Sequence, residues 1–235
     1  MKQIQETIIR RISLFLIAAV LLSFSPFSHG QETTVKIALI GDSTVTDEAG
    51  WGAAFAERFN KKAKVINFAK SGATMQSLSK RVDDLVALKP DYVLIQFGHN
   101  DQKRYLPETY RDHLLSYVER IRLAGGKPII VSSVTRRNFD EKGKIVPATG
   151  SRLKAKLTLY AETARSVATE LSLPFIDLYR ISVDHHNQIG VEASMVYNPK
   201  DGDKTHFNDK GAQAVTDLIL EEFKKVVPEL VRCLK

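Results

Sequence analysis

Five short apolar runs alternate with longer segments of helical periodicity, and this alternation constrains the fold more than any other feature of the chain. The runs cover residues 35–40, 65–68, 92–97, 129–134 and 175–178. They are nearly continuous rather than alternating, as is typical of strands that are covered on both faces. Because parallel strands require crossover connections, the pattern predicts an α/β fold with a five-stranded parallel sheet between helical layers.

Helical spacing of apolar residues occupies the segments between these runs. It covers residues 51–59, 75–88, 110–124 and 152–171, and a last helix is expected over residues 209–226. No internal repeat or low-complexity linker is present, so residues 31–235 are expected to form one domain. The long, charged connection over residues 135–151 follows a strand, and we expect it at the edge of the sheet where the strands end.

The first thirty residues resemble a secretory signal peptide. Lys2, Arg10 and Arg11 precede an apolar run over residues 12–24, and small residues around Gly30 offer a cleavage site. The run has thirteen residues, whereas a helix needs ~20 to span a bilayer. We therefore expect segment 1–30 to be removed, and the protein to be secreted or periplasmic without a stable membrane anchor.

The charge pattern argues against a nucleic-acid partner. The net charge is +7, and removal of three basic residues and one acidic residue with segment 1–30 leaves +5. Basic and acidic residues are interleaved rather than gathered, which is typical of a solvated surface, although an acidic polymer such as a polyuronate remains a possible partner. Cys233 is the single cysteine, so no intramolecular disulfide can form.

Polar residues follow several of the predicted strands. The first run ends in Gly41-Asp42-Ser43, a tripeptide that also occurs in ordinary turns. Gly72 follows the second run, Gly98-His99-Asn100-Asp101 follows the third, and Asp203-Lys204-Thr205-His206 precedes the last helix. Because ligands of open parallel sheets bind at the carboxyl ends of the strands, we expect these residues to meet at one edge.

These residue types suit nucleophilic catalysis. A serine hydroxyl becomes reactive when a histidine takes its proton and a carboxylate orients that histidine. Ser43, His206 and Asp203 can supply this set, with the last two on one short loop. The backbone N–H groups of Ser43 and Gly72 and the side-chain amide of Asn100 could then donate to the developing oxyanion.

The four blocks resemble those of the SGNH (GDSL-like) hydrolase superfamily. The resemblance implies a flavodoxin-like three-layer α/β/α fold, Ser43 as nucleophile, His206 as base and Asp203 as its orienting acid. It also implies an oxyanion hole made by Ser43, Gly72 and Asn100.

Within this superfamily, the chain is similar to the rhamnogalacturonan acetylesterase branch, which removes acetyl groups from pectin. Thr44, His99 and residues 203–207 carry this similarity. One departure is Ala73-Thr74 after Gly72, where an Arg-Ser pair is common in that branch. The departure leaves the ester chemistry unchanged but keeps another acetylated glycan, such as xylan, as an alternative substrate.

Other polar and aromatic residues have both functional and structural interpretations. His99, Arg136 and Arg137 are candidate substrate contacts, the two arginines as a clamp for a uronate carboxylate, although solvated charge is an equal alternative for that loop. His185-His186 lacks the further ligands of a zinc site and is expected at a solvated helix end. Trp51 is expected in the core. No metal and no cofactor are expected.

The sequence thus predicts a serine esterase that removes O-acetyl groups from a plant cell-wall polysaccharide or its oligosaccharides through an acyl-enzyme. An esterase of the same fold that acts on a lipid or aryl ester is one alternative, but the polar residues Thr44, His99 and Asn100 favour a small acyl group. A non-catalytic carbohydrate-binding module is another alternative, although such a module would not need the complete catalytic set. The oligomeric state is left open.

Overall fold

The computed structural model describes residues 34–235, whose five strands form one parallel sheet. The expected signal peptide, residues 1–30, lies outside the described residues. The strands are β1 (Val35–Gly41), β2 (Ala63–Asn67), β3 (Tyr92–Gln96), β4 (Lys127–Val131) and β5 (Phe175–Ile176). All neighbouring strands are parallel, in the order β2-β1-β3-β4-β5. This is the flavodoxin-like order, so the predicted fold class is confirmed.

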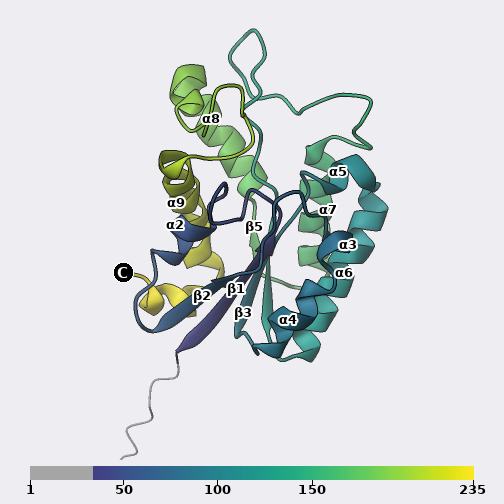
Figure 1. The fold of residues 1–235 in the computed structure, drawn as a ribbon, viewed down its shortest axis with the longest axis vertical. Helices are drawn as coiled ribbons and strands as arrows, with labels where there is room; N and C mark the ends of the chain where they lie inside the picture. The colour runs from purple at the N-terminus through teal and green to yellow at the C-terminus, as the bar shows by residue number, and fades with distance from the viewer. Residues whose placement is uncertain (1–33) are drawn as a thin grey trace, which may run out of the picture. The chain divides into compact units, whose positions relative to one another are not determined.

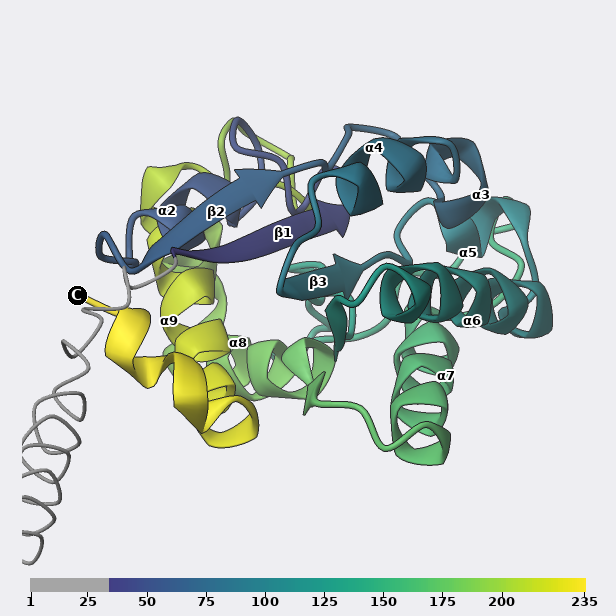
Figure 2. The same ribbon diagram turned by 90° about the horizontal axis from the view of Figure 1, so that it is seen from below.

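Two helical layers cover the sheet (Figure 1). One layer holds α2 (Gly52–Ala56), α8 (Leu178–Met195), α9 (Asp209–Val226) and the 3₁₀ helix η1 (Pro228–Cys233). The other holds α3 (Met75–Leu78), α4 (Arg81–Ala87), α5 (Asp101–Arg104), α6 (Pro107–Leu123) and α7 (Leu157–Glu170). Figure 2 shows α2 and α9 on one side of β1 and β3, and α6 and α7 on the other. No helix of residues 34–235 is long and apolar enough to cross a bilayer.

Each face of the sheet has its own apolar core. Along β1, Ile37 and Leu39 are buried under the layer that contains α9, whereas Ala38 and Ile40 are buried under α4 and α6. Successive side chains of a strand point to opposite faces, so a run that is apolar throughout serves both cores. This double burial explains why the strand sequences show no alternation.

The last long helix begins directly after the residues expected in the active site. The side chain of Asn208 caps α9 by accepting a hydrogen bond from the backbone N–H of Gly211 at 3.0 Å. Val215, Ile219 and Phe223 then recur every four residues and are buried against the sheet. The cap and this apolar stripe fix the point at which the loop over residues 196–208 ends.

The structure differs from the sequence prediction most in the region after β5. The run predicted over residues 175–178 ends as a strand at Ile176, because the side chain of Asp177 caps α8 by accepting from the N–H of Arg180. Helix α8 itself was not predicted, and its periodicity is interrupted at Gly190, whose φ is 81°. The expectation of a solvated helix end is wrong for His186, which is buried and hydrogen-bonded to Ser194 at 2.9 Å.

Two of the other predicted helices have different bounds. The helix predicted over residues 75–88 is divided into α3 and α4, and the helix predicted over residues 152–171 begins at Leu157. The residues before Leu157 instead extend the long connection after β4. Trp51 lies in the core as expected, with its ring 5.5 Å from that of Phe55.

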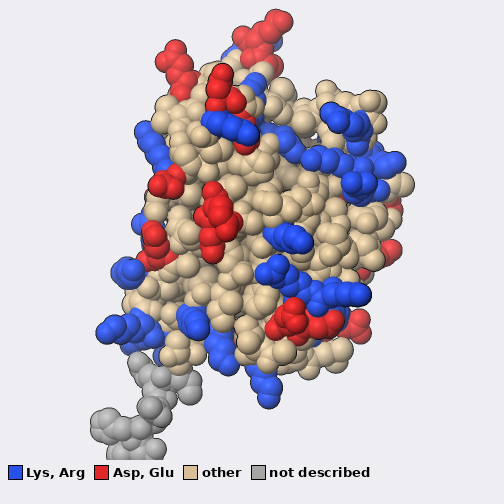
Figure 3. All heavy atoms as spheres, in the orientation of Figure 1, with Lys and Arg blue, Asp and Glu red and all other residues tan. Residues whose placement is uncertain are grey.

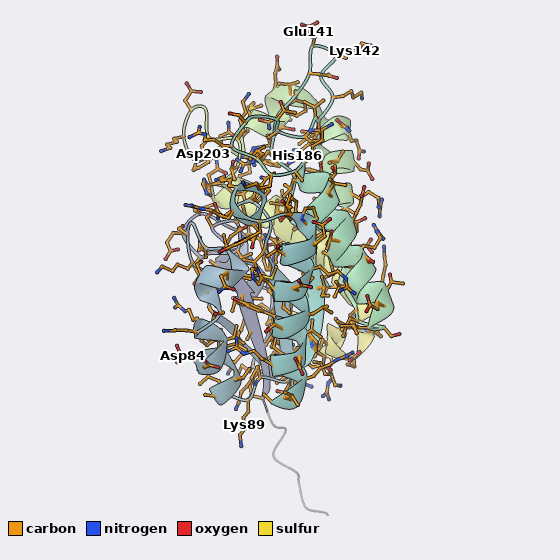
Figure 4. All side chains as sticks on the ribbon, turned by 90° about the vertical axis from the view of Figure 1, so that its right-hand side faces the viewer. Asp84, Lys89, Glu141, Lys142, His186 and Asp203 are labelled. Carbon is orange, nitrogen blue, oxygen red and sulfur yellow. The ribbon has the colours of Figure 1, made fainter. Side chains whose placement is uncertain are left out.

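The loops that follow the strands lie at one end of the described unit. Figure 4 shows Asp203 toward the same end as Glu141 and Lys142, which belong to the long connection after β4. Asp84 and Lys89, which precede β3, lie at the opposite end. The carboxyl ends of the strands therefore define the side on which the polar strand-end residues gather.

Candidate active site

Ser43, His206 and Asp203 are joined in series by hydrogen bonds. The Oγ of Ser43 lies 2.9 Å from Nε2 of His206, and Nδ1 of His206 lies 2.9 Å from Oδ2 of Asp203. Since the ionised carboxylate can only accept, Nδ1 carries a proton and Nε2 is free to accept the hydroxyl proton of Ser43. Ser43 is largely buried, with 7% of its surface exposed. The arrangement permits proton transfer from the serine to the histidine.

The carboxylate of Asp203 is held in its ionised form by its own loop. Burial acts to raise its pKa, but hydrogen bonds from the backbone and ring of His206 and from the backbone of Thr205 outweigh burial and lower the pKa to about 2. Asp203 is therefore ionised at neutral pH. It can orient the histidine ring and stabilise the positive charge that the ring gains when it accepts a proton.

Three hydrogen-bond donors are available near the serine. Within residues 34–235, the backbone N–H groups of Ser43 and Gly72 donate to no protein acceptor. The side chain of Asn100 donates from Nδ2 to the carbonyl of Ala73 at 3.0 Å and accepts at Oδ1 from Lys103 at 3.3 Å. Both contacts require the same amide orientation, which leaves one N–H of Nδ2 for a ligand.

Glycine is required at two positions around the serine for different reasons. At Gly41, an added Cβ would lie 2.4 Å from the side chain of Val45 and 2.6 Å from the carbonyl of Gln96. At Gly72, φ is +77°, which disfavours other residues, and nothing lies within 4 Å of the added Cβ. Gly41 therefore permits close packing beneath Ser43, whereas Gly72 borders open space.

A buried polar network fixes the loop that carries Ser43. Asp42 accepts through Oδ1 from the N–H and the hydroxyl of Thr44, at 3.0 and 2.8 Å. Gln96 donates to the Thr44 hydroxyl at 2.6 Å and accepts from the indole N–H of Trp51 at 2.9 Å. Gln96 was not predicted as a site residue, although an amide within an apolar strand is a usable signal. Oδ2 of Asp42 is buried without a hydrogen-bond partner, but the bonds that Thr44 and Gln96 make restrict the position of the neighbouring serine.

Asp101 has a comparable positioning contact on the other side of the serine. Its Oδ1 accepts from the backbone N–H of Met75 at 3.1 Å, and this bond fixes the start of α3 shortly after Gly72. Its Oδ2 is buried without a hydrogen-bond partner. Burial is the main reason that its pKa is raised to about 7.

Arg137, an expected substrate contact, lies beneath the loop that carries His206. It is buried, and its guanidinium donates to Oδ1 of Asn198 at 2.7 Å and to the backbone carbonyls of Asp203 and His206. Burial lowers its pKa to about 10, so it is still a cation at neutral pH. The geometry does not suit a uronate clamp, since these contacts turn the side chain toward the catalytic loop. Its partner Asn198 was also missed, and nothing in its local sequence signals the contact.

His99 is likewise placed away from the substrate side. It is buried, and its Nε2 lies 3.0 Å from the backbone carbonyl of Val134, to which it donates. Burial, and then the positive charge of Arg136, hold the pKa of His99 well below its usual range, so the ring is neutral. Its contact with Val134 ties the third block to the segment after β4.

Arg136 is the one of the three expected substrate contacts that lines a cleft. It donates to the hydroxyl of Thr205, between Asp203 and His206 in the chain. It borders two clefts of about 800 and 910 Å³, both walled by residues 148–149 of the long connection after β4. The connection over residues 135–151 therefore forms the wall between the catalytic loop and α5. Within residues 34–235, no three His, Cys, Asp or Glu side chains are grouped to hold a metal ion.

A serine, a histidine and an aspartate linked in this way at the carboxyl edge of a parallel sheet define a class of serine hydrolases. Residues 39–214 match the GDSL-like lipase/acylhydrolase family, and the chain belongs to this family. It is an SGNH-type esterase, as its sequence blocks indicated.

Comparison with known proteins gives two informative relatives from Bacillus subtilis strain 168. The rhamnogalacturonan acetylesterase RhgT is 34% identical over 82% of this chain and 90% of its own length. The probable rhamnogalacturonan acetylesterase YesY is 27% identical over 81% of this chain and 93% of its own length.

Solved structures share the fold. The B. subtilis protein YxiM superposes with a TM-score of 0.69 at 22% identity, over 82% of this chain and 57% of that structure. The acetylxylan esterase Axe2 from Geobacillus stearothermophilus gives a TM-score of 0.61 at 18% identity, over 82% and 94%. At these identities, the likeness supports the fold and leaves the substrate open.

Proposed function

We propose that this protein is a carbohydrate esterase that removes O-acetyl groups from a plant cell-wall polysaccharide, with acetylated rhamnogalacturonan as the expected substrate. The observation that carries the proposal is the hydrogen-bonded series of Ser43, His206 and Asp203. The substrate is supported by the relative at 34% identity, which is named a rhamnogalacturonan acetylesterase.

The reaction follows from the roles that these groups can take. Ser43 Oγ attacks the acetyl carbonyl while His206 Nε2 accepts the serine proton, and Asp203 stabilises the resulting imidazolium. The oxyanion accepts hydrogen bonds from the N–H groups of Ser43 and Gly72 and from Asn100 Nδ2. As the intermediate collapses, His206 returns the proton to the departing sugar oxygen, which leaves an acetyl-enzyme.

The second half of the reaction uses the same groups with water. His206 takes a proton from a water molecule, which attacks the acetyl carbonyl on Ser43, and a second oxyanion forms in the same place. Its collapse breaks the bond to Ser43 Oγ, His206 returns the proton to that oxygen, and acetate leaves.

A short acyl group fits the surroundings better than a long one. The walls of the two clefts are mainly polar and charged, with few apolar side chains such as Val146, Pro147 and Leu153. A long acyl chain gains its binding free energy from continuous apolar burial, whereas charged side chains lie between the apolar ones in these walls. The proposal therefore favours acetyl esters over lipid esters.

Hydrolysis assays with three different esters distinguish the proposed function from its alternatives. Purified residues 31–235 would be offered acetylated rhamnogalacturonan, acetylated xylan and a long-chain aryl ester, with Ser43→Ala as the matched control. We expect acetate release mainly from the first substrate, and a covalent adduct on the Ser43 peptide after treatment with a serine-directed organophosphonate. Hydrolysis of the long-chain ester alone would refute the substrate, and sugar binding without adduct or acetate release would indicate a binding module.

We also propose that the protein is exported after removal of residues 1–30, as their basic, apolar and small-residue regions indicate. The single domain of the mature protein would then be residues 31–235. Mass spectrometry of the protein recovered from the periplasm or the medium of the source cells should give an N-terminal peptide that begins at Gln31. A peptide that retains residues 1–30 would refute export by cleavage.

A further inference from the structure

Beside the catalytic residues lies a groove of about 910 Å³ that we call the basic groove. Its side chains include five cations and no carboxylate: Lys103, Arg104, Arg136, Arg152 and Lys154. The cations come from α5, from the start of the long connection and from its end before α7. In Figure 3, Lys and Arg atoms gather at the upper right, over α5 and the end of that connection.

None of these five cations forms a close ion pair within residues 34–235, although Asp42 and Asp203 act on Arg136, and Asp42 acts on Lys103, from a longer distance. By contrast, Arg111, Arg120 and Arg165 each pair with a carboxylate on the surface. The Nε atom of Arg136 is buried without a hydrogen-bond partner. Like charges held together without an anion repel one another, so a bound anion would remove an unfavourable interaction.

The charges are close enough to influence one another. Burial, and after it the charge of Arg136, lowers the pKa of Lys103; the charge of Asp42 opposes this, whereas Arg152 and Arg104 lower the pKa further. The second cleft that Arg136 borders differs, because Asp201 and Asp203 line it together with its lysines. Of the two clefts that Arg136 borders, the basic groove is therefore the one whose charged side chains are all cations.

The basic groove is continuous with the catalytic residues at two points. Lys103 donates to Oδ1 of Asn100, the proposed oxyanion donor, at 3.3 Å. Arg136 donates to Thr205, between Asp203 and His206. A polymer whose acetyl group lies at Ser43 would therefore have its neighbouring sugar units along the basic groove.

We propose that the basic groove binds the carboxylates of uronic-acid units that adjoin the acetylated sugar, and so selects an acidic polysaccharide. Guanidinium groups bind carboxylates in a bidentate manner, and the hydroxyls of Thr149 and Ser151 can bond to sugar hydroxyls. No aromatic side chain lines the groove, which disfavours the base stacking of single-stranded nucleic acid. This inference rests on the proposed function and deepens it.

The test compares two substrates that differ only in charge. One is an acetylated oligosaccharide with galacturonate carboxylates, and the other is the same oligosaccharide after reduction of those carboxylates to alcohols. We expect wild-type kcat/KM to favour the acidic form by about tenfold, equivalent to ~1.4 kcal/mol. The preference should fall as salt is added, because the groove opens to solvent.

Two double variants with the same change in net charge test whether the preference for the acidic oligosaccharide depends on the basic groove. Arg104→Gln with Arg152→Gln alters the basic groove, and the preference should fall to within about twofold. Lys61→Gln with Lys64→Gln alters exposed lysines near the start of β2, away from the strand ends, and should retain the full preference. Calorimetry with deacetylated oligogalacturonate should show binding that only the groove variant weakens, by about tenfold.

The outcomes separate this inference from the proposed function. Acetate release from both oligosaccharides without preference, or a preference that survives in the groove variant, would overturn the basic groove as a uronate site and leave the esterase standing. No acetate release together with groove-dependent binding of oligogalacturonate would refute the esterase and retain the site. Binding of single-stranded DNA or anionic vesicles, but not of oligogalacturonate, would overturn the inference.

Discussion

Replacement of Arg137 by methionine should show whether this arginine positions Asp203 and His206 or contacts the substrate. Methionine keeps much of the buried apolar stem but leaves three acceptors without a donor: Oδ1 of Asn198 and the carbonyls of Asp203 and His206. Each unsatisfied buried acceptor costs about 1–3 kcal/mol of stability. Part of the combined cost of the three acceptors is offset, because the variant no longer has to desolvate a guanidinium. We expect the free energy of unfolding to fall by about 3–5 kcal/mol.

The same substitution should lower kcat, because Asp203 and His206 lose their shared support. Misplacement of catalytic groups by about 1 Å can cost on the order of a hundredfold in rate, so we expect kcat to fall by roughly that factor. Because Arg137 is buried and bonded to the catalytic loop, KM for an acetylated oligosaccharide should change by less than about twofold.

Urea denaturation and steady-state kinetics of Arg137→Met test both expectations, with two control variants. Arg111→Met makes the same chemical change in a surface pair with Glu170 and should cost no more than about 1 kcal/mol. Arg137→Lys keeps the charge but lacks the planar fork, and should recover part of kcat. A normal kcat with a raised KM would refute the positioning role and indicate that Arg137 contacts the substrate.

Three further predictions concern the site and its buried acids. Asn100→Ala should lower kcat by about a hundredfold with little change in KM, since an oxyanion donor acts in the transition state; steady-state kinetics within about twofold of wild type would remove Asn100 from the hole. Asp203→Asn and His206→Ala should be far from additive in kcat, since both act on one proton path, and full additivity would contradict that coupling. Asp101, with its pKa raised to about 7 from 3.8, releases its proton later in the folded than in the unfolded chain, so wild-type stability should fall between pH 4 and 8 by an amount on the order of 4 kcal/mol. Urea titrations should show a much smaller fall for Asp101→Asn, and equal falls would refute the buried-acid assignment.

The sequence predicted well where the polar residues lie relative to the sheet, because the order of strands and helices alone determines these positions. Ser43, Gly72 and Asn100 follow three different strands, and a parallel sheet brings the ends of all its strands to one edge. Asp203 and His206 precede a helix whose apolar period was evident, so their place beside that edge followed from chain order. Such features require no knowledge of side-chain contacts.

The pair Arg136 and Arg137 shows why contacts were harder to predict. The two residues are adjacent in the segment after β4, and the sequence offered no reason to separate them. The two side chains nevertheless have different environments: Arg136 lines the clefts, whereas Arg137 is buried beneath the loop that carries His206. Which arginine faces the clefts depends on Asn198 and on the unpredicted helix α8 before it, both distant in sequence.

Ser43 and His206, the proposed nucleophile and base, lie on loops that separate networks of buried polar groups hold in place. Thr44 and Gln96 fix the loop of Ser43 against β3, whereas Arg137 and the cap residue Asn208 fix the loop of His206 against α9. The hydrogen bond from Ser43 to His206 joins the two loops directly, at 2.9 Å. Since neither loop is a helix or strand, buried hydrogen bonds provide the rigidity that catalysis requires of them.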